Sequence, residues 1–263
     1  NPRFASDAKV VSRFMAEARA ASQIHHPNIV EVLAFGTLAD GRHFQVMPLL
    51  EGHTLEDELR ARGRLSPAEA LAILGPLASA LSACHAAGVV HRDLKPANVF
   101  LVLAPDGSWA PTLLDFGIAK LLTAEIPREH RTATGARIGT PYYMSPEQCG
   151  GPDVDHKSDI YAFGVLAYEM LTGSVPFRDS TVIGVLYQHT SVPPEAPSQR
   201  QPALDPAFDP AVLALLAKRP EARPASIEQA FQRIAAVLGP SEAGATLPTA
   251  VSDTLLRAPS PPP

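Results

Sequence analysis

The amino-acid sequence predicts an unequal α+β fold, in which a small part with short strands is followed by a larger and mostly helical part. Strand-like patterns occur at residues 29–36 and 42–48, and a second short hairpin is expected within residues 99–114. Apolar segments with helical spacing precede, separate and follow these strands. Few strands followed by many helices indicate an α+β body.

The first 50 residues are expected to form a helix and a hairpin. Apolar residues recur at helical spacing between residues 8 and 24. Pro27 ends this helix, because the residue before a proline is biased away from helical geometry. Asp40 and Gly41 then separate the two strand patterns and can supply the positive φ angles of a tight turn.

A helix with clear start signals is expected from residue 67 to about residue 85. Ser66 can cap its N-terminus, and Pro67 suits the first helical position. Glu69 can reach back to complete a capping box.

The apolar run at residues 71–90 is long enough to suggest a membrane span. Pro76 and His85 interrupt it, so we expect a buried helix, with a kink where Pro76 removes one backbone hydrogen bond.

The second half of the chain is expected to be mainly helical. Short strands at residues 99–103 and 112–114 flank a turn. An apolar helix is then expected at residues 159–171, capped by Ser158 and stopped by Gly173. Helical patterns broken by prolines continue to residue 238.

Composition excludes several classes of protein. The chain has 263 residues, a formal net charge of −5 and two cysteines, Cys84 and Cys149. This charge does not favour a nucleic-acid partner, and two cysteines make neither a zinc cluster nor a disulfide scaffold. We therefore expect a cytoplasmic protein without a membrane segment, ending in a disordered proline-rich tail at residues 239–263.

Three motifs carry the chemistry of the chain. The octet His91-Arg92-Asp93-Leu94-Lys95-Pro96-Ala97-Asn98 lies between an expected helix and an expected strand, Asp115-Phe116-Gly117 follows the hairpin, and residues 139–147 read Gly-Thr-Pro-Tyr-Tyr-Met-Ser-Pro-Glu. Over residues 14–238 the sequence resembles bacterial eukaryotic-like serine/threonine protein kinases. The resemblance implies a two-lobe kinase fold, with a helix and two strands of an incomplete smaller lobe and a mostly helical larger lobe.

The resemblance assigns phosphoryl transfer to the octet and to Asp115, with ATP and Mg²⁺ as cofactors and serine or threonine hydroxyls of proteins as acceptors. Asp93 would accept the proton of the substrate hydroxyl. Lys95 would lie against the transferring phosphate. Asn98 and Asp115 would supply hard oxygen ligands for Mg²⁺.

The resemblance also places the adenine site at a hinge after the second expected strand. Met47 would lie at the back of the pocket, and the carbonyl of Pro48 and the backbone N–H of Leu50 would bind the adenine edge. A proline is tolerable at position 48, because the carbonyl is the only group needed there. Phe100 would form the floor beneath the base.

Other residues match structural positions of kinases. Glu17 resembles the helix glutamate that pairs with a strand lysine. Glu147 and Arg223 match a buried ion pair, and Asp159 matches an aspartate that binds the backbone of the catalytic loop.

Regulation of the kinase activity by phosphorylation is expected in the segment between Asp115 and Glu147. Thr132 and Thr134 resemble threonines that bacterial relatives autophosphorylate, and a phosphate there would meet the charge of Arg92. Thr140 is a poorer candidate, because in the family its hydroxyl serves the catalytic loop.

The chain departs from the family pattern at its start. Residues 1–13 contain neither a glycine-rich loop nor a strand lysine, and Lys9 is too close to Glu17 to replace that lysine. We therefore expect a truncated kinase domain, made of a partial smaller lobe (residues 1–50) and a larger lobe (residues 51–238), that transfers little or no phosphate by itself. The alternative is a pseudokinase-like binding or scaffold module.

Overall fold

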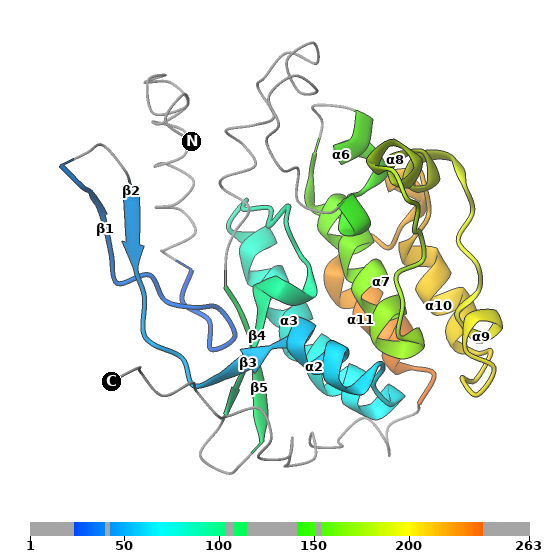
Figure 1. The fold of residues 1–263 in the computed structure, drawn as a ribbon, viewed down its shortest axis with the longest axis horizontal. Coiled ribbons are helices and arrows are strands. Elements are labelled where there is room, and N and C mark those ends of the chain that lie inside the picture. Colours follow the sequence, from blue (N-terminus) through cyan, green and yellow to red (C-terminus); the bar gives the residue numbers. More distant parts are fainter. Residues whose placement is uncertain (1–23, 40–42, 104–107, 115–140, 151–153, 239–263) are drawn as a thin grey trace, which may run out of the picture.

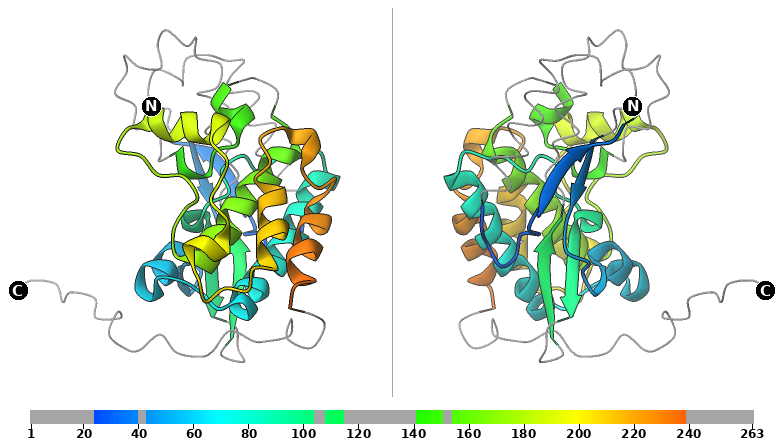
Figure 2. Two further views of the ribbon diagram at one scale, coloured as in Figure 1. Left: turned by 90° about the vertical axis from the view of Figure 1, so that its right-hand side faces the viewer. Right: turned by 90° about the vertical axis from the view of Figure 1, so that its left-hand side faces the viewer.

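The computed structural model describes residues 24–39, 43–103, 108–114, 141–150 and 154–238. The strands lie on one side of the molecule and the helices of the second half of the chain on the other (Figure 1, Figure 2). This is the α+β arrangement that the sequence predicts, with a small strand-containing part and a larger helical part.

Two antiparallel sheets are present. The first pairs β1 (Ala34–Thr37) with β2 (His43–Val46), so the first predicted hairpin is confirmed. The second has the order β3-β4-β5, formed by β3 (Gly52–Thr54), β4 (Val99–Leu103) and β5 (Trp109–Leu113). The sequence indicated β4 and part of β5, but not β3.

The strand predicted at residues 29–36 is wrong over most of its length. Ile29 makes a single parallel bridge to Leu113, and the regular strand begins only at Ala34. The backbone around Ile29 is held by β5 instead, because Val30 N donates to Leu113 O (2.9 Å) and Leu113 N donates to Asn28 O (2.8 Å). The segment therefore joins the two sheets.

The helical elements are α2 (Leu55–Arg62), α3 (Pro67–Ala86), η1 (Pro96–Asn98), η2 (Pro141–Tyr143), α6 (Pro146–Gly150), α7 (His156–Thr172), α8 (Val182–Ser191), α9 (Pro197–Arg200), α10 (Phe208–Leu215), η3 (Pro220–Ala222) and α11 (Ile227–Ala235). Helix α2 was not predicted from the sequence, although Thr54 and Asp57 form a capping box at its start. The helix predicted at residues 8–24 lies outside the described residues, apart from Ile24, which is not helical.

The start of α3 confirms the predicted capping box. Ser66 Oγ accepts from Glu69 N (3.3 Å), and the Glu69 carboxylate accepts from Ser66 N (2.8 Å). The helix runs through Pro76 to Ala86. Within the described ranges, α3 is the one helix long and apolar enough to cross a membrane. However, 56% of its most apolar 18-residue stretch is buried inside the protein.

The predicted start of α7 is wrong by three residues. Asp155 caps the helix, with its carboxylate accepting from Lys157 N (2.8 Å), and Ser158 lies inside the first turn. The predicted stop is confirmed, because Gly173 has a φ of 79° and donates to Glu169 O (2.7 Å). A side chain at Gly173 would also lie 2.8 Å from Gly63 O.

Helix α7 is the centre of the core. Tyr161, Phe163 and Tyr168 on this helix are fully buried, and α3, α10 and α11 pack around it. Gly164 permits close contact with α10, since a Cβ atom there would lie 2.7 Å from Leu215 Cβ. The position of any residue on α7 is therefore fixed by packing on several sides.

His189, at the end of α8, is a fully buried titratable group beside α7. Its Nδ1 lies 2.9 Å from the hydroxyl of Tyr161, and its ring meets the ring of Phe177 edge-on at 5.0 Å. Lys218 Nζ donates to His189 O (2.8 Å). Burial and the nearby Lys218 charge lower the pKa of His189 from 6.5 to about 4.

This pKa predicts a loss of stability in mild acid. Between pH 6.5 and about 4 the unfolded chain protonates His189 and the folded chain does not. The free energy of unfolding should therefore fall as the pH falls through this range, by on the order of 3 kcal/mol from this residue. Urea unfolding of the wild type and of His189→Gln at several pH values measures it, and the variant should show the shallower dependence. His156→Gln is the control, since the side chain of His156 is 39% exposed. Equal slopes for the wild type and His189→Gln would contradict the assignment.

Candidate active site

The loop between α3 and β4 is fixed by one buried carboxylate. Asp159 is 1% exposed. Its Oδ2 accepts from His91 N (2.8 Å) and its Oδ1 accepts from Arg92 N (2.8 Å). His85 Nε2 lies 2.8 Å from Oδ2 as well. Asp159 thus holds two consecutive backbone amides of the loop, as the sequence predicts.

The backbone of Arg92 has an unusual conformation. Its φ is 64°, which places it, alone among the described residues other than glycine, in the left-handed region. Such a conformation costs about 1–2 kcal/mol and persists only where the surroundings hold it. The peptide is held on its other side too, because Gln148 Nε2 on α6 donates to Arg92 O (2.8 Å).

Three predicted catalytic residues meet within this loop. Lys95 Nζ lies 2.8 Å from Asp93 Oδ2. Asn98 Nδ2 donates to Asp93 O (2.8 Å) and to Asp93 Oδ2 (3.0 Å). The side chains of Asp93 and Lys95 are 16% and 32% exposed, so this fixed carboxylate remains partly accessible to solvent.

Asn98 and the end of β5 bring together the elements expected to bind a metal. Asn98 uses its amide nitrogen for Asp93, so its amide oxygen is the atom suited to a cation. The backbone carbonyl of Asn98 accepts a hydrogen bond from the backbone N–H of Leu114 (3.0 Å), and Asp115 follows Leu114 directly. Asp115 itself lies outside the described residues. Within the described ranges, no three His, Cys, Asp or Glu side chains form a metal-binding group. Of the two expected ligands, the structure describes Asn98, whose amide oxygen is a hard ligand of the kind that suits Mg²⁺.

The predicted hinge connects β2 to β3 (Figure 1). Met47 and Leu50 are partly buried and Pro48 is exposed. Phe100 lies on β4 opposite Thr54 of β3, which brings it next to the end of the hinge segment.

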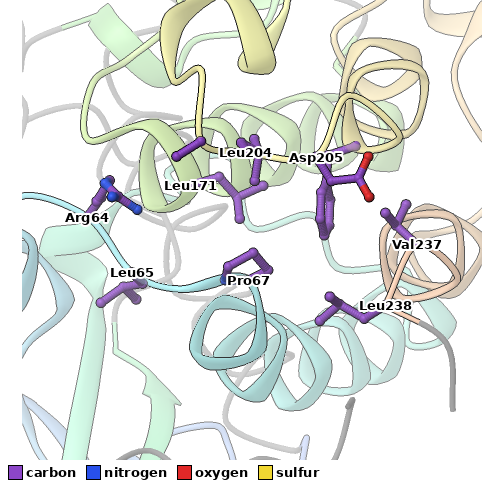
Figure 3. Close-up of a pocket in the computed structure, with 10 residues that line it drawn as sticks. Arg64, Leu65, Pro67, Leu171, Leu204, Asp205, Val237 and Leu238 are labelled. Carbon is purple, nitrogen blue, oxygen red and sulfur yellow. The ribbon is translucent and has the colours of Figure 1, made fainter. Parts of the chain in front are cut away.

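A separate cavity of about 270 Å³ lies at the N-terminal end of α3 and the C-terminal end of α7. Its lining includes Arg64, Pro67, Leu171, Asp205 and Leu238 (Figure 3). None of its lining residues belongs to the catalytic loop or to the predicted hinge.

The predicted ion pair between Glu147 and Arg223 is present. Two parallel bonds join them, Nη1 to Oε1 (2.7 Å) and Nη2 to Oε2 (2.8 Å). The Arg223 side chain is fully buried, and its remaining donors bind backbone carbonyls such as Ala217 O (2.8 Å). Burial raises the pKa of Glu147, but hydrogen bonds from Arg223 and Ser158 outweigh it and hold the pKa below its ordinary value. This pair anchors α6, and with it Gln148.

Sequence reasoning missed several supporting residues. His85 and Gln148 contact partners 74 and 56 residues away, so no local pattern marks them. The hydroxyl of Tyr143 donates to Glu169, whose pKa burial raises. The predicted residues Glu17, Thr132, Thr134 and Thr140 lie outside the described residues, as Asp115 does.

Asp159→Asn should loosen the catalytic loop. An amide has one acceptor oxygen, so one of the two backbone N–H groups would lose its partner inside the protein, at a cost of about 1–3 kcal/mol. Thermal unfolding and hydrogen exchange at the amides of His91 and Arg92 measure the effect, and both amides should exchange faster. Asp155→Asn on the same helix is the control, because asparagine caps a helix about as well as aspartate. If both variants behaved alike, Asp159 would not have this role.

Comparisons with known proteins agree with the motifs. The protein kinase domain family matches residues 3–234. The chain is 40% identical over 225 residues to the serine/threonine-protein kinase pkn3 of Myxococcus xanthus, covering 85% of this chain and 41% of that protein. It is 38% identical over 222 residues to the serine/threonine-protein kinase PknB of Mycobacterium tuberculosis, covering 83% and 34%. The chain thus spans less than half the length of these two relatives.

A solved structure shares the fold. The kinase domain of PknI from Mycobacterium tuberculosis, crystallised as a double mutant, superposes with a TM-score of 0.71 and 27% sequence identity. The match covers 93% of this chain and 83% of that one. The predicted resemblance and the two-lobe fold with a helical larger lobe are confirmed. The chain belongs to the protein kinase domain family and is similar to bacterial serine/threonine kinases.

Proposed function

We propose that this chain belongs to the catalytic domain of a serine/threonine protein kinase, an enzyme that transfers the γ-phosphate of ATP to serine or threonine hydroxyls of proteins. The observation that carries the proposal is the Asp93 carboxylate. It is bound by Lys95 and Asn98 on a loop whose backbone Asp159 holds in place. Phosphoryl transfer asks a protein mainly for positioned charges, and this loop supplies them.

In this proposal Asp93 orients the substrate hydroxyl and accepts its proton. Two donors meet at its Oδ2, which fixes the plane of the carboxylate before a substrate arrives. Lys95 adds a positive charge beside the reacting oxygens. ATP bound with Mg²⁺ supplies the phosphoryl group and neutralises its charge, as is general in this family.

Asn98 and Asp115 would hold the metal, each through one oxygen. The bond from Leu114 N to Asn98 O supports this assignment, because it fixes the end of β5 next to Asn98. The adenine edge would bind to Pro48 O and to Leu50 N–H, with Met47 behind the base and Phe100 beneath it. The pairing of β3 with β4 supports this, since it carries the hinge exit alongside Phe100.

The remaining assignments follow from the family and the composition. A net charge of −5 favours protein substrates over nucleic acid. We assign residues 1–50 to the smaller lobe and residues 51–238 to the larger one. We assign this kinase domain to the cytoplasm, a location that suits the use of ATP.

Asp93→Asn and Asp115→Asn should have opposite effects on binding and turnover. Both are made in the protein expressed from its complete reading frame. Asp93→Asn should lower kcat about 10²–10⁴-fold and leave the Kd of Mg-ATP within about twofold, because it removes a proton acceptor. Asp115→Asn should weaken Mg²⁺-dependent nucleotide binding. Kinetics and calorimetry separate the two effects, and circular dichroism confirms folding. Loss of nucleotide binding in a folded Asp93→Asn protein would make its assigned role wrong.

Phosphorylation of Thr132 or Thr134 should raise activity. A phosphate adds about −1.5 to −2 charges and three acceptor oxygens, which can order the segment against Arg92. Mass spectrometry of the active protein should place phosphate on one of the two, and replacing both by alanine should lower kcat. Thr190→Ala on the exposed face of α8 is the control. Full activity of the double variant would reject this switch.

A further inference from the structure

A chain of charged and polar side chains begins directly after the predicted hinge. His53 on β3 donates from Nε2 to Glu58 Oε2 (2.9 Å) on α2. Arg62, one turn further on α2, donates to Glu58 Oε1 (3.0 Å) and to Glu69 Oε1 (2.7 Å) on α3. We name these four residues, His53, Glu58, Arg62 and Glu69, the hinge-exit network. It connects β3 through α2 to the start of α3.

The hinge-exit network is largely buried and satisfied at each link. The side chains of Glu58 and Glu69 are 6% and 10% exposed, whereas those of His53 and Arg62 are 24% and 33% exposed. A buried carboxylate is costly unless it is paired, and both oxygens of Glu58 have a partner. The second oxygen of Glu69 accepts from Ser66 N (2.8 Å). Removing one member therefore leaves a buried charge without its partner.

The His53 ring is held on its other side by an aromatic contact. It meets the Trp109 ring of β5 edge-on, with centroids 4.7 Å apart and an interplanar angle of 77°. His53 therefore lies between a strand of its own sheet and the carboxylate of α2, and both neighbours restrict the orientation of its ring.

The backbone before His53 has few anchors of its own. Strand β3 is an edge strand of three residues. Glu51 O accepts from Leu103 N (3.0 Å). Gly52, with a φ of 145°, passes so close to β4 that a Cβ atom would lie 1.9 Å from Leu101 O. Leu50 precedes this short contact by two residues and lies in no strand. A strand this short gives little rigidity without side-chain contacts.

We propose that His53 is a positioning residue for nucleotide binding, which fixes the backbone that presents Leu50 N–H through its bond to Glu58 and the rest of the hinge-exit network. The inference rests on the proposed function, because it concerns the adenine edge assigned there. His53 acts from behind the site and does not touch the nucleotide. The amides of His91 and Arg92 in the catalytic loop are held by Asp159 on α7, which is not a member of the hinge-exit network. Loss of the His53 bond should therefore affect binding more than turnover.

Four variants of the protein expressed from its complete reading frame test the proposal. His53→Phe keeps a ring against Trp109 but removes the donor, whereas His53→Gln keeps an N–H donor within reach of Glu58. Arg62→Gln breaks the hinge-exit network one link further from the hinge and serves if His53→Phe does not fold. Arg60→Ala is the matched control, since it removes an exposed ion pair with Asp57 on the same helix, with side chains 65% and 47% exposed.

The measurements are the Kd of Mg-ADP, the steady-state constants for ATP and hydrogen exchange of residues 50–54 without nucleotide. His53→Phe should raise Kd and the KM for ATP about 3–10-fold with kcat within about twofold, because the edge becomes less preorganised. It should also speed exchange at residues 50–54 but not at residues 91–98. Arg62→Gln should act in the same direction, whereas His53→Gln and Arg60→Ala should stay near the wild type.

Two failures can be told apart. A wild type that binds no Mg-ADP rejects the proposed function and the nucleotide role of His53 with it, whatever the exchange shows. A wild type that binds Mg-ADP while both His53→Phe and Arg62→Gln bind it equally well overturns the inference alone. A parallel loss of kcat, with faster exchange at residues 91–98, also overturns it, because His53 would then support the fold in general. The same loss in His53→Gln would show that the ring, and not the bond to Glu58, is what matters, and would overturn it too.

Discussion

The carboxylate of Asp159 is the constraint on which the geometry of the candidate site depends. It accepts hydrogen bonds from two consecutive backbone amides, and the second belongs to Arg92, whose φ of 64° would be unfavourable without such support. Asp159 can do this because α7 is packed on several sides and cannot shift. The conformation of this loop is thus determined by the core. The packing of α7 offsets the free-energy cost of the unfavourable backbone conformation at Arg92.

The three-stranded sheet brings together the pieces that the motifs only name. Strand β3 leaves the predicted hinge, β4 leaves the catalytic loop at Asn98, and β5 leads through Leu114 to Asp115. None of these strands exceeds five residues, so each would be weak alone. Side-chain anchors compensate for this, and their residues lie on helices. The hinge-exit network, through Glu58 on α2, and the contacts of Asp159 on α7 are two examples.

Features encoded by neighbouring residues could be predicted from the sequence. The capping box of Ser66 and Glu69 and the left-handed Gly173 depend on a few adjacent positions, and both were found. The start of α7 was misassigned because Asp155 and Ser158 are both good caps, and the fold uses Ser158 to bind Glu147 instead. In the site, the octet revealed Asp93, Lys95 and Asn98. The sequence did not reveal His85 or Gln148, because a histidine or a glutamine has no distinguishing neighbours when its partner is more than 50 residues away.

Two hydrogen bonds to the peptide groups of Arg92 connect the catalytic loop to Arg223, which lies late in the sequence. Its N–H is held by Asp159 on α7, and its carbonyl is held by Gln148 on α6. Helix α6 has five residues and no buried side chain, so it cannot hold Gln148 in place by packing alone. Glu147, its neighbour, is tied by two bonds to Arg223. The guanidinium of Arg223 also donates to the carbonyls of Ala217 and Lys218, which follow α10, and to that of Lys157 on α7. The peptide of Arg92 is therefore fixed on one side by the core and on the other by a buried ion pair from late in the sequence. A preorganised loop of this kind needs both, because a single anchor would leave the peptide free to rotate.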